Sequence, residues 1–128
     1  MKRFIVGAAI AVIIPLLAAC GGSATSAVAG NTFTVNATDF TGTTSVTIKA
    51  GGTVQFVDPS SNGGTHFLVI GQNAQFQSDA QAPADLNTAN GLEIDAGQTK
   101  TVTFANAGTY HITCTIHPSM NVTVTVNP

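Results

Sequence analysis

Hydrophobic and polar residues alternate with a period of two along most of the chain from Thr32 onward. This period is typical of β-strands that bury one face, because successive side chains point to opposite sides of a sheet. The alternating stretches are residues 33–37, 46–48, 54–56, 102–104, 110–114 and 122–126, and residues 66–70 form a further expected strand. Turn sequences such as Gly51-Gly52 and Ala107-Gly108 separate these stretches. About seven to eight short strands predict an all-β fold, an antiparallel β-sandwich with Greek-key links.

Residues 71–91 break the alternation and are rich in glutamine, asparagine, aspartate and alanine. We expect a long connection here that can include a short helix. Long connections in compact domains often carry function or move.

The N-terminus has a different pattern. Lys2 and Arg3 precede an apolar run, 4–17, which is followed by small residues and Cys20. The run is short for a membrane span, which needs roughly 20 residues. It therefore predicts a secretory signal peptide, and a short anchor helix that stays attached is the alternative.

The sequence Leu17-Ala18-Ala19-Cys20 resembles the lipobox of bacterial lipoproteins. The resemblance implies that residues 1–19 are removed as a lipoprotein signal peptide and that Cys20 carries a lipid. An ordinary signal cleaved nearby would instead leave Cys20 as a free thiol. Residues 20–31 are small and predict a flexible tether, and residues 32–128 form the folded domain.

Charge is scarce, with only 8% of residues charged. Once the signal is removed, Lys49 and Lys100 stand against six acidic residues, so the net charge is −4 with a blocked terminus and neutral histidines. This balance argues against nucleic acid as a partner, since nucleic-acid binding needs a basic surface. If Cys20 holds lipid, Cys114 is a lone cysteine in an exported protein and needs another role.

That role is suggested by residues 110–126, which read YHITCTIHPSMNVTVTV. Cys114, His117 and Met120 stand three residues apart on one turn between strands, and His66 begins an earlier strand. A thiolate, two imidazoles and a weak thioether form the ligand set of blue copper. A structural zinc site is less consistent with this set, because methionine is not among the usual zinc ligands. His111 should face the opposite side of the sheet from Cys114, so we expect a surface residue there.

Each of these residues also has an ordinary structural interpretation. Cys114 can be a buried thiol, Met120 can fill the core, and His66 can be a surface histidine at a strand end. The combination and its spacing favour a metal site over these separate explanations.

The spacing Cys-x-x-His-x-x-Met, together with Gly108-Thr109-Tyr110, resembles the cupredoxins of the plastocyanin and amicyanin group. The likeness extends from Phe33 to Val126 and is strongest from Gly97 onward. It implies a cupredoxin-like domain holding one type 1 copper ion that cycles between Cu(I) and Cu(II). The last loop would supply three ligands and His66 the fourth, with His117 reaching the surface through an apolar patch.

Two positions depart from the family pattern. Phe67 follows the first histidine, where many cupredoxins have an asparagine that ties the two ligand loops together. Thr65 and Thr115 are candidate substitutes for that tether. Asn121 follows the methionine, where a glycine is usual.

The expected function is single-electron transfer at the cell envelope by an exported monomer, anchored through its N-terminal lipid on the periplasmic or extracellular side of a membrane. Its partners would be redox proteins that donate and accept electrons. A copper chaperone, store or sensor using the same residues is the alternative. An oxidase or nitrite reductase needs further histidine-rich copper centres, and the chain has three histidines. Nucleophilic catalysis by Cys114 and a histidine is conceivable but leaves Met120 unexplained, so we do not expect an enzyme.

Overall fold

The computed structural model describes residues 30–128. The predicted signal peptide, Cys20 and most of the predicted tether lie outside these residues. Ten strands are present: β1 (Thr32–Val35), β2 (Phe40–Thr41), β3 (Ser45–Lys49), β4 (Gly52–Val57), β5 (Thr65–Gln72), β6 (Gln75–Phe76), β7 (Leu92–Asp95), β8 (Thr99–Phe104), β9 (Gly108–Cys114) and β10 (His117–Asn127). Within residues 30–128 no helix is present, so none is long and apolar enough to cross a membrane.

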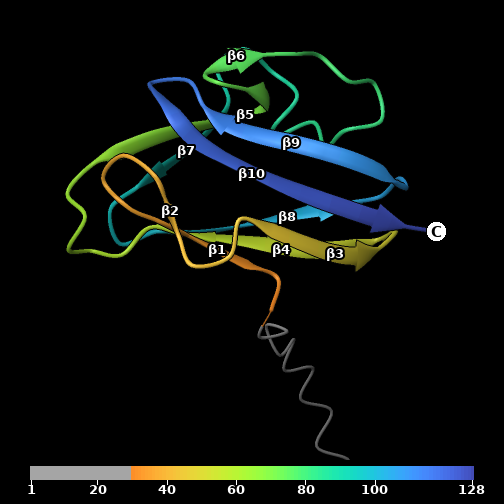
Figure 1. Cartoon of the computed structure of the whole chain (residues 1–128), viewed down its shortest axis with the longest axis horizontal. Helices are drawn as coiled ribbons and strands as arrows, with labels where there is room; N and C mark the ends of the chain where they lie inside the picture. Colours follow the sequence, from red (N-terminus) through yellow and green to blue (C-terminus); the bar gives the residue numbers. More distant parts are fainter. Residues whose placement is uncertain (1–29) are drawn as a thin grey trace, which may run out of the picture.

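The strands form two layers, as Figure 1 shows. One sheet has the order β2-β1-β4-β8, and the other has the order β3-β10-β9-β5-β6, with β7 also paired to β5. The predicted all-β sandwich is therefore confirmed. Its sheets are mixed, however, because β1 pairs with β4 and β3 pairs with β10 in parallel, whereas the other pairings are antiparallel.

The core lies between the two sheets and is built by the alternating side chains. Phe33 of β1 and Phe56 of β4 are buried and stack with their ring centroids 5.6 Å apart. Val122, Val124 and Val126 of β10 are buried in the same cluster. The sequence pattern thus identified the buried side chains of the alternating strands, whereas β5 is buried at four consecutive residues, 68–71.

Residues 71–91 contain no helix. Strand β5 continues into this segment, turns at Asn73 and Ala74, both with positive φ, and pairs with β6. Turns occupy most of the remainder. Tyr110 of β9 links this segment to the sandwich, because its hydroxyl lies 3.2 Å from the carbonyl oxygen of Gln81. The same hydroxyl lies 2.9 Å from the carbonyl oxygen of Asn106, which follows β8.

Candidate metal centre

Three metal-binding side chains converge at one end of the second sheet. His66 lies on β5, Cys114 ends β9 and His117 begins β10, and their candidate ligand atoms all lie within 4.8 Å of one another. The Cys114 Sγ atom lies 3.9 Å from Nδ1 of His66 and 3.7 Å from Nδ1 of His117. His66 and Cys114 are fully buried, whereas His117 is half-buried.

The strand pairing explains why residues so far apart in sequence meet here. Strands β5 and β9 are adjacent, and Leu68 pairs with Cys114, which places His66 just beyond the end of β9. Strands β9 and β10 form a hairpin in which Cys114 pairs with His117. The sheet therefore fixes all three backbones without a long loop.

Met120 lies in an irregularity of β10. The register shifts between His117 and Asn121, so residues 118–120 bulge out of the ladder. Within the bulge, Met120 is fully buried and belongs to the same core cluster as Cys114, whereas Pro118 and Ser119 are exposed. Its assignment as a copper ligand stays a prediction.

Hydrogen bonds from three directions hold this bulge. The Asn121 amide nitrogen donates to the Pro118 carbonyl at 2.8 Å, and the Asn121 amide oxygen accepts the backbone N–H of Asn73 at 2.8 Å. The Ser119 hydroxyl donates to the Thr38 carbonyl at 2.9 Å. Asn121, a departure from the family pattern, thus connects the bulge to the turn between β5 and β6.

The two candidate substitutes for the missing asparagine behave differently. The backbone N–H of Thr115 donates to the Phe67 carbonyl at 3.0 Å and directly links the two ligand segments. The Thr65 hydroxyl instead donates to the Asp95 carboxylate at 2.6 Å and ties β5 to β7. Of these two candidates, Thr115 alone connects the segment of His66 to that of Cys114, and it does so through its backbone.

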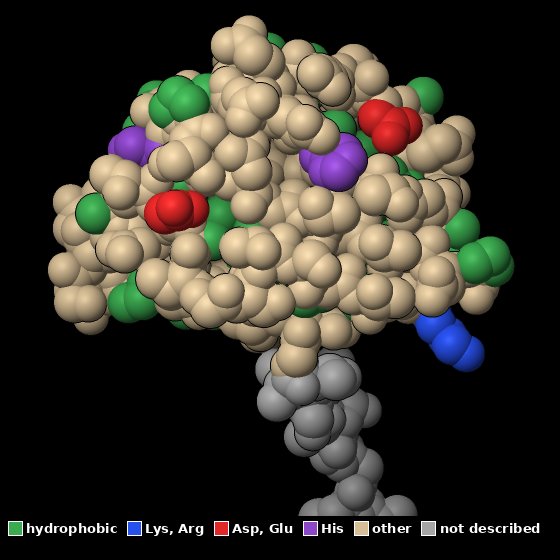
Figure 2. Space-filling view, in the orientation of Figure 1, with side chains coloured by type: hydrophobic (Ala, Val, Ile, Leu, Met, Phe, Trp, Pro, Cys, Tyr) green, Lys and Arg blue, Asp and Glu red, His purple; other side chains and the backbone are tan. Residues whose placement is uncertain are grey.

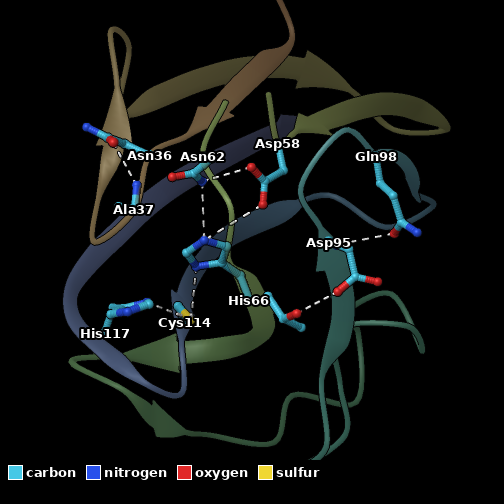
Figure 3. Close-up of polar contacts among 10 residues, drawn as sticks. Asn36, Ala37, Asp58, Asn62, His66, Asp95, Gln98, Cys114 and His117 are labelled. Atoms are coloured by element: carbon cyan, nitrogen blue, oxygen red, sulfur yellow. Dashed lines mark hydrogen bonds and ion pairs between the residues drawn. The ribbon is translucent and has the colours of Figure 1, made fainter. Parts of the chain in front are cut away.

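A polar group on the far side of His66 was not identified from the sequence. His66 lies between Cys114 on one side and Asp58 and Asn62 on the other (Figure 3). Its Nε2 atom is 3.8 Å from Asp58 Oδ2 and 3.4 Å from the Asn62 amide nitrogen. The Asp58-Pro59 sequence is typical of a turn, and nothing in its spacing relates it to a histidine eight residues later.

Electrostatics favour the form of His66 that binds a metal. Burial lowers the pKa of His66, the Asp58 carboxylate partly offsets this, and the nearby His117 lowers it further. A neutral imidazole has a free lone pair for a metal ion. Within residues 30–128 Cys114 forms no disulfide, so its sulfur atom is available to a metal ion.

His111 is confirmed as a surface residue. It is exposed on β9, and its Nδ1 atom lies 3.2 Å from the Thr123 hydroxyl of β10. Charged side chains are also few and scattered on the face of the molecule in Figure 2. Within residues 30–128, the group of three or more potential metal ligands that lie close together is the His66, Cys114 and His117 cluster.

Comparison with known proteins assigns the family. The model of the copper binding proteins of the plastocyanin/azurin family matches residues 29–127. The chain therefore belongs to this family. No curated protein matches the chain in sequence.

Solved structures of amicyanin share the fold. A proline-to-phenylalanine amicyanin mutant in the reduced state is 24% identical with a TM-score of 0.57, over 81% of this chain and 88% of that chain. Amicyanin from Paracoccus versutus (Thiobacillus versutus) is 25% identical with a TM-score of 0.57, over 78% of this chain and 83% of that one.

The donor atoms fit the copper that the family implies. A buried soft thiolate and two imidazole nitrogens, all within 4.8 Å of one another, match the ligand preferences of copper in both oxidation states. The cofactor is therefore a type 1 copper ion.

Proposed function

We propose that this protein is a lipid-anchored blue-copper electron carrier, a monomer and not an enzyme, in which His66, Cys114, His117 and Met120 hold the metal. The observation that carries the proposal is the convergence of the first three side chains at the buried end of a β-sandwich. Copper supplies one-electron chemistry when bound, alternating between Cu(I) and Cu(II).

The chain's own contribution is rigidity. His66, Cys114 and His117 all belong to paired strands, and the Thr115–Phe67 hydrogen bond ties the two ligand segments together. A site whose ligand residues are held in paired strands would impose nearly the same geometry on both oxidation states. Such a site suits repeated electron transfer better than metal release, which favours a carrier over a chaperone or store.

The surface beside His117 supports contact with redox partners. Ile116 is the one large hydrophobic side chain that is exposed among residues 30–128, with 53% of its surface accessible, and Pro118 is also exposed. These residues flank the half-buried His117. The imidazole edge is therefore the place where an electron would enter or leave.

The location of the protein is proposed from the N-terminal sequence. The charged start, the apolar run and the lipobox-like Leu17-Ala18-Ala19-Cys20 support lipidation of Cys20. Lipid on Cys20 would hold the domain at the cell envelope, on the periplasmic or extracellular side of a membrane, where donor and acceptor proteins meet it.

Visible absorption and voltammetry of the Cu(II)-loaded protein test the proposed function. We expect an intense thiolate-to-copper band and a reversible one-electron wave, both lost in Cys114→Ser because the thiolate causes the band. His111→Gln is a matched control, since it changes an exposed histidine on the same strand. A colourless wild-type protein, or a Cys114→Ser variant that keeps the band, would refute the ligand assignment.

A further inference from the structure

A buried carboxylate with an unused oxygen lies behind the copper site. Asp58 directly follows β4, and only 1% of its surface is accessible. Its Oδ1 atom accepts a hydrogen bond of 2.8 Å from the Asn62 amide, whereas its Oδ2 atom is buried and has no hydrogen-bond partner. A buried carboxylate oxygen without a partner is strongly unfavourable, so its retention calls for a functional explanation.

The nearest basic group is the imidazole of His66. The only ion pair of Asp58 within residues 30–128 joins its Oδ2 to His66 Nε2 at 3.8 Å, and both side chains are fully buried. The opposite nitrogen, Nδ1, faces the Cys114 sulfur at 3.9 Å. The imidazole therefore directs one nitrogen to the metal-binding cluster and the other to the carboxylate (Figure 3).

The protonation of His66 in the metal-bound form follows from this arrangement. A nitrogen that donates its lone pair to a metal cannot carry a proton, so Nε2 carries the N–H. The Asn62 amide nitrogen, 3.4 Å away, is itself a donor and already bonds Asp58 Oδ1. Asp58 Oδ2 is the acceptor left for this N–H, and a small rotation of the imidazole would shorten 3.8 Å to hydrogen-bond length.

We propose that Asp58 is a positioning residue of the copper site, which accepts the Nε2–H of His66 and lowers the reduction potential through its buried negative charge. The hydrogen bond would fix the tautomer and the orientation of the imidazole, as carboxylates do behind other metal-binding histidines. A negative charge in a low-dielectric interior stabilises Cu(II) over Cu(I). The inference rests on the copper site of the proposed function and is independent of the partner proteins.

Asp58→Asn tests the role of the charge. Asparagine keeps the size and one acceptor oxygen but removes the negative charge. We expect the blue band to remain and the ratio of Cu(II) to Cu(I) affinity to fall at least tenfold, a rise in reduction potential of about 59 mV or more.

Glu93→Gln is the matched control for this variant. Glu93 is an exposed carboxylate on β7, the strand paired with β5. Glu93→Gln changes the net charge by the same amount as Asp58→Asn, but at a position where water and salt screen the charge. The reduction potential of the Glu93→Gln variant should stay close to that of the wild-type protein. Equal potentials in Asp58→Asn and Glu93→Gln would overturn the inference.

Proton NMR of the Cu(I) wild-type protein gives a test that needs no variant. The Nε2–H of His66 should exchange slowly with water and resonate downfield, as a hydrogen bond to a carboxylate requires. A rapidly exchanging Nε2–H would overturn the positioning role, even if Asp58→Asn fails to fold. A wild-type protein without blue colour would refute the proposed function. If the wild-type protein is blue but Asp58→Asn has the same reduction potential, only this inference is refuted.

Discussion

Replacing Met120 by leucine separates the two roles that this side chain can have, axial donor or core packing. Met120 is fully buried in the β10 bulge, three residues after His117. Leucine fills a similar volume without a sulfur atom. Because volume-conserving core substitutions are well tolerated, we expect the free energy of unfolding of the metal-free protein to change by less than about 1.5 kcal/mol.

The reduction potential should respond much more strongly than the stability. A weak thioether donor favours Cu(II), so its loss in Met120→Leu should raise the potential, with about 59 mV for each tenfold change in relative affinity. Met120→Gln should lower the potential, because an amide oxygen is a harder donor that favours Cu(II). Protein-film voltammetry measures both shifts, and the visible spectrum reports whether the copper–thiolate bond survives.

Val124→Ala is the packing control for this pair of variants. Val124 is fully buried on the same strand and offers no donor atom, so its truncation should destabilise the protein and leave the potential unchanged. If Met120→Leu and Met120→Gln both keep the wild-type potential and spectrum, Met120 is ordinary core packing. The copper would then have another axial group or none.

Two further predictions concern the N-terminus and the connection between β6 and β7. Cys20→Ser should release the protein from membranes of its native host, measured by fractionation, and an uncleaved signal on the mature wild-type protein would contradict lipidation. Tyr110→Phe should cost about 1 kcal/mol of unfolding free energy, because it removes the hydroxyl that bonds Asn106 and Gln81. Burial and then the Asp79 carboxylate raise the pKa of Tyr110, so native stability should fall as the pH rises above about 10, and pH-dependent denaturation should show this loss weakened in Tyr110→Phe.

Most of the long strands could be predicted because they bury every second side chain between the two sheets, although β5 buries residues 68–71 in succession. Strands β2 and β6 have only two residues each, too few to show a period, and they depend on pairing with β1 and β5. The parallel pairings of β1 with β4 and of β3 with β10 were also missed. Alternation determines which face of a strand is buried but not the direction of its neighbour.

The candidate site, like the fold, could be predicted from the sequence only in part. Cys114 and His117 lie on one hairpin, so their sequence spacing is enough to predict that they are neighbours. His66 could be predicted because a copper site with one thiolate and one imidazole needs a second imidazole ligand. Asp58 reaches His66 across the turn after β4, and this contact depends on how that turn folds back against β5. A side chain that contacts a ligand residue from the side away from the metal has no fixed spacing from it in sequence, so the sequence alone does not relate Asp58 to His66.

The two departures from the family pattern have different structural consequences. With Phe67 after the first histidine, the connection between ligand segments is made by the backbone N–H of Thr115, which does not depend on the side chain at position 67. With Asn121 in place of the usual glycine, the bulge that carries Met120 gains two side-chain hydrogen bonds, one within the loop and one to the β5–β6 turn. Both connections restrict how far Met120 and Cys114 can move relative to His66. The rigidity that electron transfer requires can therefore be retained without the asparagine and the glycine of the family pattern.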